Sequence, residues 1–140
     1  MEESRKILIV TDDEESTQKL AADIASVIVP PVFEACSVSI LKSDVFYGTD
    51  ILPAHNFFLG CGSPSPLSFT YIEMLFERIN LAGRSCGIFS SNPTALKYLY
   101  RLLRDSDLFV GRPLLAKNGV VDGARLGEWV KTILKNGGIL

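Results

Sequence analysis

Short apolar runs alternate with helical patterns along the chain, and this alternation constrains the fold more than any other feature. Residues 6–10 (KILIV), 56–60 (NFFLG) and 85–89 (SCGIF) are rich in β-branched or aromatic residues, as buried parallel strands are. Polar turns and segments with apolar residues every three or four positions separate these runs. The pattern predicts a parallel sheet with right-handed helical crossovers.

Two further strands complete the predicted sheet. The second lies within residues 32–41, and residues 43–54, which show no regular period, are expected to form a connection. The fifth begins within residues 108–111 and can resume at Leu114-Leu115 and at Val120-Val121. Five βα units predict a three-layer α/β sandwich with strand order 2-1-3-4-5 and helices on both faces of the sheet. We expect residues 1–140 to form a single domain of this kind.

Helix boundaries are marked by Gly, Pro, Asn and Asp. We expect Gly83 to end a long third helix with an inner apolar stripe, formed by Ile72, Leu75, Phe76 and Ile79. Asn92-Pro93 has the pattern of an N-cap followed by a first helical residue. Asp122 is expected to cap the last helix in the same way.

Composition narrows the function classes. The formal net charge of −2 argues against a nucleic-acid partner, because such proteins usually carry a strong positive charge. No apolar stretch is long enough for a membrane span, and no signal peptide is recognisable. The three cysteines, Cys36, Cys61 and Cys86, have no Cys-x-x-Cys spacing, so they fit neither a disulfide framework nor a zinc site. We expect a cytoplasmic protein with reduced thiols.

The candidate site follows from the predicted strand order. Ligands of open α/β sheets bind outside the carboxyl ends of the strands, where the strand order reverses. Here that point lies between strands one and three, next to residues 11–17, 60–66 and 90–93. The sole histidine, His55, precedes strand three and is expected at the opposite edge, which argues against a histidine-based triad.

Several segments, taken in order, resemble the flavodoxin family nearly end to end. They are KILIV at 6–10, FFLGC at 57–61, LAGRSCGIF at 81–89, and VVDG at 120–123 leading to Glu128-Trp129. The resemblance implies flavin mononucleotide (FMN), clamped by the three loops and used for one-electron transfer with a redox protein partner. It implies the following cofactor-binding residues: Ser16, Thr17, Cys61, Gly62, Ser63, Ser90, Ser91 and Asn92.

The first loop differs from the family in its charge. Flavodoxins wrap the phosphate with a loop rich in Thr, Ser and Gly, whereas this chain has four carboxylates at residues 12–15. A carboxylate about 4 Å from a phosphate charge costs about 1 kcal/mol in water and about 4 kcal/mol near a protein surface. The second loop, residues 60–66, has no aromatic residue to stack on a flavin ring. We therefore expect FMN to bind more weakly than in the family.

The start of the chain also resembles response-regulator receiver domains. Receivers hold Mg²⁺ with an acidic pair after strand one, which is Asp12 and Asp13 here, and hard oxygen ligands suit that ion. Ser90 or Ser91 matches the receiver's hydroxyl residue, but strand three ends in Gly60-Cys61 and has no phosphoacceptor aspartate. Two functions stay open: FMN-dependent electron transfer, or a cofactor-free binding or regulatory module with a protein partner. Whether the chain is an enzyme also stays open.

Overall fold

The strands form one parallel sheet. The computed structural model describes residues 5–28, 36–51, 54–104, 108–117 and 120–135. The sheet is built from β1 (Arg5–Thr11), β2 (Cys36–Lys42), β3 (Asn56–Gly60), β4 (Ser85–Ser90), β5 (Phe109–Val110) and β6 (Leu114–Leu115). Their order is β2-β1-β3-β4-β5, with β6 also paired to β4, and all the pairings are parallel. The predicted order 2-1-3-4-5 is confirmed, as is the resumption at Leu114-Leu115.

Two predicted strands differ from the structure or extend beyond its described residues. The prediction of a strand at Val120-Val121 is wrong, because neither residue belongs to a strand, and Val120 is 67% exposed with its amide donating to the Lys117 carbonyl. For the second strand, residues 32–35 of the predicted range lie outside the described residues.

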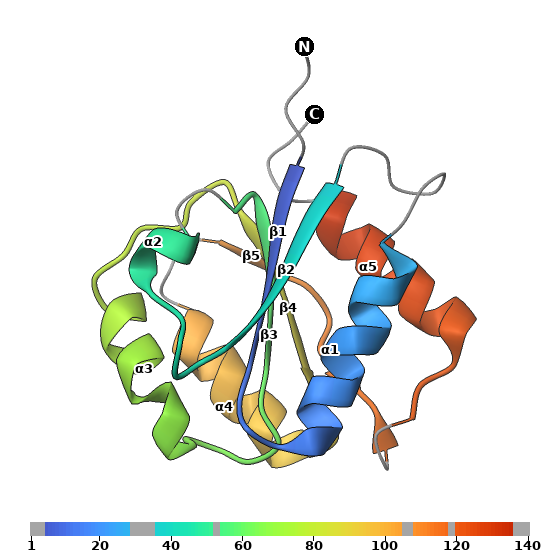
Figure 1. The fold of residues 1–140 in the computed structure, drawn as a ribbon, viewed down its shortest axis with the longest axis horizontal. Coiled ribbons are helices and arrows are strands. Elements are labelled where there is room, and N and C mark those ends of the chain that lie inside the picture. The colour runs from blue at the N-terminus through green and yellow to red at the C-terminus, as the bar shows by residue number, and fades with distance from the viewer. Residues whose placement is uncertain (1–4, 29–35, 52–53, 105–107, 118–119, 136–140) are drawn as a thin grey trace.

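Helices cover both faces of the sheet (Figure 1). They are α1 (Glu15–Val27), α2 (Gly48–Ile51), α3 (Thr70–Phe76) after a 3₁₀ turn (η1, Leu67–Phe69), α4 (Pro93–Leu103) and α5 (Gly123–Lys135). In Figure 1, α1 and α5 lie on one side of the sheet, and α2, α3 and α4 on the other. The short helix α2 was not predicted and interrupts the connection expected at residues 43–54.

Alternation along β1 explains the two cores. Ile7 and Ile9 are buried in the cluster formed with α1 and α5, while Leu8 and Val10 are buried in the cluster formed with α3 and α4. Successive side chains of a strand point to opposite faces, so a strand without a polar side is needed between two helical layers.

The third helix is shorter than the sequence predicts. It ends at Phe76, and the amides of Arg78 and Ile79 both donate to the Leu75 carbonyl in the turn that follows. Gly83, with a φ of +84°, lies in a later turn that leads into β4 and does not end the helix. Between the two turns lies Leu81, which is 0% exposed.

The predicted caps place two helices. The Asn92 side chain accepts a hydrogen bond of 2.9 Å from the Thr94 amide, and Asp122 accepts one of 3.2 Å from the Arg125 amide. Because Asn92 follows β4 almost directly, its cap fixes the start of α4 at the carboxyl end of the sheet.

The carboxyl ends of β1, β3 and β4 meet at one edge of the sheet, where α1 and α4 also begin (Figure 1). His55 lies at the opposite edge, where its amide donates to the Lys6 carbonyl. In the described part of the chain, no helix is long and apolar enough to cross a membrane.

Candidate functional site

Asp12 lies at the centre of the carboxyl edge and is 2% exposed. One carboxylate oxygen accepts a hydrogen bond of 2.8 Å from the Gly62 amide, and the other accepts one of 3.2 Å from the Glu14 amide. Each bond satisfies a backbone donor, and hydrogen bonds to a charged acceptor are the stronger kind. Asp12 therefore holds the connection after β1 against the connection after β3.

Ser90 and Asn92 join the connection after β4 to the same place. The buried Ser90 hydroxyl donates to the Cys61 carbonyl at 2.6 Å and accepts from the Asn92 amide at 2.9 Å. The Asn92 side chain donates to the Gly62 carbonyl at 3.2 Å. Both backbone groups of Gly62 are thus bound by side chains of this chain, through Asp12 on one side and Asn92 on the other.

Glu14 covers the outer side of the second connection. Its carboxylate accepts a hydrogen bond of 3.3 Å from the Ser63 hydroxyl. It also lies so close to Gly62 that a Cβ at that position would overlap it. Glu14 was seen in the sequence as one of four acidic residues but was not singled out, because no spacing rule indicates which of the four would reach across.

Cys61 is buried beside this acidic cluster. Burial, together with the negative charges of Asp12 and Glu14, raises the pKa of its thiol to about 12, against a smaller lowering by the Ser63 backbone. A thiol reacts as its thiolate, so this environment suppresses nucleophilic chemistry at Cys61.

Among the described residues, the other residues predicted for the site make no hydrogen bond to Asp12 or Glu14. Ser16 and Ser91 are half-buried, and Asp13 is exposed. Thr17 is buried in the first turn of α1, and its hydroxyl has no hydrogen-bond partner among the described residues. Helix α1 also begins without a side-chain cap, so its first amides keep free hydrogen-bonding capacity.

Several flavodoxins of known structure share this architecture. The chain matches flavodoxin 2 from Bacillus cereus with a TM-score of 0.75 and 17% sequence identity, over 93% of this chain and 98% of that one. It matches a flavodoxin from Streptococcus pneumoniae TIGR4 with a TM-score of 0.73 and 14% identity, again over 93% and 98%. This chain has a flavodoxin-like fold. No family model and no curated protein matches its sequence.

The chain also matches the structure of a short-chain flavodoxin associated with a bacterial microcompartment. That match has a TM-score of 0.71 and 10% identity, and it covers 95% of this chain and 99% of the other. At identities of 10–17% the likeness establishes the fold alone, because one fold hosts many functions and function resides in the site.

The switch-point residues of this flavodoxin-like chain fit FMN poorly. The Gly62 amide and carbonyl are taken by Asp12 and Asn92, so they do not point toward a ligand. The carboxylates of Asp12 and Glu14 lie against the second connection, where the phosphate-bearing cofactor would meet negative charge.

The acidic pair predicted for Mg²⁺ is divided between two environments. Asp12 is buried with both oxygens bonded to amides, whereas Asp13 is exposed. Among the described residues, no group of three or more His, Cys, Asp or Glu side chains could hold a metal ion. The arrangement gives Mg²⁺ no support.

Proposed function

We propose that this chain is a binding module with a flavodoxin-like fold that acts without flavin, by contacting another protein through the carboxyl edge of its sheet. The observation that carries the proposal is the Asp12 carboxylate bonded to the Gly62 amide. A side chain of the protein takes the backbone donor that a ligand at the switch point would need, and it brings a negative charge with it.

The negative charge of the first loop also argues against a phosphate-bearing ligand. Glu14, Asp13 and Glu15 are exposed at the same loop. A phosphate dianion entering here would meet several carboxylates, at a cost of about 1 to 4 kcal/mol for each pair of charges about 4 Å apart. Hydrogen bonds from the first amides of α1 would have to offset this repulsion.

The same edge offers a surface for a protein. Leu67, in the connection after β3, is 93% exposed, and the exposed rings of Tyr47 and Tyr71 lie 6.4 Å apart. Apolar groups beside exposed carboxylates match a partner surface with an apolar centre and a cationic rim. A regulatory protein of that chemistry is the partner we propose.

FMN-dependent one-electron transfer is the second candidate. It is favoured by the likeness to flavodoxins along almost the whole chain. It is also favoured by the Thr17 hydroxyl in the first turn of α1, which has no hydrogen-bond partner in the described part of the chain. FMN would supply the redox chemistry, and Ser16 and Thr17 would hold its phosphate at the helix N-terminus.

Flavin binding separates the two candidates. We expect the purified full chain to be colourless. When the protein is added to micromolar FMN, the flavin fluorescence should stay unquenched. A yellow protein with a bound-flavin spectrum would overturn the proposal in favour of the second candidate.

The protein contact has its own test. The unmodified chain, immobilised on a column, should retain its partner protein. The immobilised triple variant, Asp13→Lys with Glu14→Lys and Glu15→Lys, should not retain it. A control with three charges reversed on other surfaces (Asp23→Lys, Glu77→Lys and Glu128→Lys) should keep it. Equal retention by both variants would contradict the acidic edge as the contact surface.

A further inference from the structure

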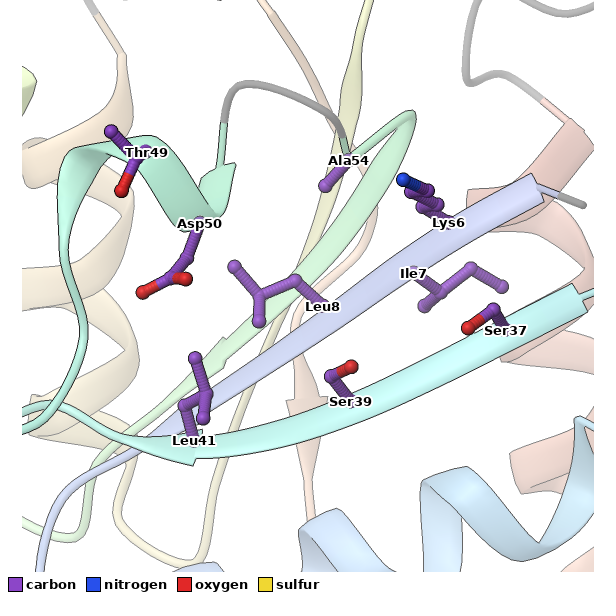
Figure 2. Close-up of a pocket in the computed structure, with 9 residues that line it drawn as sticks. All are labelled: Lys6, Ile7, Leu8, Ser37, Ser39, Leu41, Thr49, Asp50 and Ala54. Atoms are coloured by element: carbon purple, nitrogen blue, oxygen red, sulfur yellow. The ribbon is translucent and has the colours of Figure 1, made fainter.

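A pocket lies on the sheet face opposite α1, over β1 and β2. Its volume is about 390 Å³, and the residues that form it are Lys6, Ile7, Leu8, Ser37, Ser39, Leu41, Thr49, Asp50 and Ala54. Figure 2 shows β1 and β2 as its floor and α2 as the wall that carries Thr49 and Asp50. The volume is in the range of small-molecule sites.

The pocket exists because this part of the sheet is thinly covered. Helix α2 has only four residues, too few to cover two strands. On β2, Ser37 and Ser39 lie beside Lys6 and Leu8 of β1 in the parallel register, and alternate residues share one face. Serine side chains fill less space than the branched apolar residues usual on such a face, so room remains above Leu8.

Opposite charges stand at the two ends of the pocket. In Figure 2, the Asp50 carboxylate lies at one end, the Lys6 ammonium at the other, and Leu8 between them. The Asp50 carboxylate accepts a hydrogen bond of 2.8 Å from the Tyr47 amide through one oxygen, which fixes its direction. Among the described residues, Lys6 has no ion-pair partner.

We propose that this pocket binds an extended zwitterion, a small molecule whose ammonium and carboxylate groups are separated by a short chain. The ammonium pairs with Asp50 and the carboxylate with Lys6. The chain between them lies over Leu8 and Ala54, and the hydroxyls of Ser37 and Ser39 are available to polar groups along it. An α-amino acid is too short, because its two charges are adjacent whereas Leu8 separates the two charges of the pocket.

This pocket shares none of its lining residues with the proposed protein contact. The flavin and protein-retention tests change no residue of the pocket, so their outcomes do not decide this one. Free ω-amino acids and short peptides share the required chemistry and are the two sources to distinguish.

The test is a titration of the ¹⁵N-labelled full chain followed by NMR. We expect 6-aminohexanoate to shift the amides of Ser39, Thr49 and Asp50 with millimolar affinity. Hexanoate and hexylamine, which each keep one charge, should bind at least about tenfold more weakly, as expected from the loss of one charged hydrogen bond. Alanyl-alanine binding more tightly than 6-aminohexanoate would assign the site to short peptides, and the reverse would assign it to ω-amino acids.

Two variants assign the charges. The Lys6→Gln variant has no partner for the carboxylate, so it should bind 6-aminohexanoate no better than it binds hexylamine. The Asp50→Asn variant has no partner for the ammonium, so it should bind 6-aminohexanoate no better than it binds hexanoate. Asparagine still accepts from the Tyr47 amide, so α2 keeps its start. The control Lys131→Gln removes a charge from α5 and should leave the titration unchanged. Equal binding of all three compounds, or no shift at these amides in a folded protein, would overturn the proposal.

Discussion

The Gly62 amide donates a hydrogen bond of 2.8 Å to the Asp12 carboxylate, across 50 residues of sequence. The bond joins the connection after β1 to the connection after β3 at the point where the strand order reverses. A carboxylate thereby does inside the protein what an anionic ligand does in a phosphate-binding loop: it satisfies backbone amides that face the switch point.

Replacing Asp12 should destabilise the fold markedly. Asp12→Ala leaves the amides of Gly62 and Glu14 without their acceptor, and a hydrogen bond to a charged group contributes about 1.5–3 kcal/mol. We expect the free energy of unfolding, measured in urea, to fall by about 2–4 kcal/mol. Asp13→Ala is the matched control: Asp13 is exposed, so its loss should change stability by less than about 0.5 kcal/mol. Equal effects of the two variants would show that the hydrogen bonds of the Asp12 carboxylate contribute nothing to stability.

Neutralising the first loop should improve FMN binding more than riboflavin binding. The double variant Asp13→Asn with Glu14→Gln removes two charges that repel a phosphate, and riboflavin has no phosphate. Fluorescence titration of both flavins should show a several-fold gain confined to FMN, and high salt should imitate it by screening. Asp23→Asn with Glu128→Gln serves as the control for net charge. Tight binding of FMN by the unmodified chain, with a strong preference over riboflavin, would contradict this account of the loop.

The Cys61 thiol should resist alkylation and disulfide exchange in the native state. With its pKa at about 12, roughly one thiol in 10⁴ is ionised at pH 8. Burial also raises the pKa of Cys86 well above its ordinary value. In a Cys36→Ser background, a thiol reagent at pH 8 should therefore report no fast-reacting group before urea is added and two groups afterwards. Rapid native labelling of Cys61 would contradict its burial.

The same shift predicts a loss of stability at alkaline pH. The pKa of Cys61 is higher in the native state than its ordinary value of 9.0, so the unfolded chain ionises first. The resulting stability is fully present below about pH 9 and is lost as pH rises from 9 to about 12. Cys61→Ala should reduce the slope of unfolding free energy against pH in this range. An unchanged slope would show that the thiol ionises equally in both states.

Two glycine-to-alanine changes should act in opposite directions. A Cβ at Gly60 would overlap the Phe89 ring, which is fully buried, and overpacking of this kind costs about 1–3 kcal/mol. Gly127 lies within α5, and nothing lies within 4 Å of a Cβ there. Gly127→Ala should stabilise the protein by about 0.5–1 kcal/mol, because alanine favours helix over glycine. Thermal unfolding of both variants measures this, and a stabilising Gly60→Ala would contradict the packing at β4.

Much of the architecture could be predicted from local pattern. The continuous β-branched run KILIV at residues 6–10 and the caps at Asn92 and Asp122 are local signals, and the structure confirms them. The end of α3 could not be predicted, because the periodic apolar pattern continues to Ile79 although the helix ends at Phe76 and the amides of Arg78 and Ile79 already donate to the Leu75 carbonyl in a turn. Helix α2 was missed because four residues are too short for a helical period to show.

The candidate site also has a part that local sequence signals predict and a part that depends on tertiary structure. The sequence by itself determined which three loops meet, since strand order follows from the alternation of strands and helices and fixes the edge at which ligands bind. Only the tertiary structure decided what those loops do there. Four neighbouring carboxylates are equivalent in a linear chain, and only the folded backbone directs Asp12 inward to Gly62 and leaves Asp13 in solvent. The zwitterion pocket needs the same long-range information, because Lys6 and Asp50 come together only through the pairing of β1 with β2 and the position of α2 over that pair.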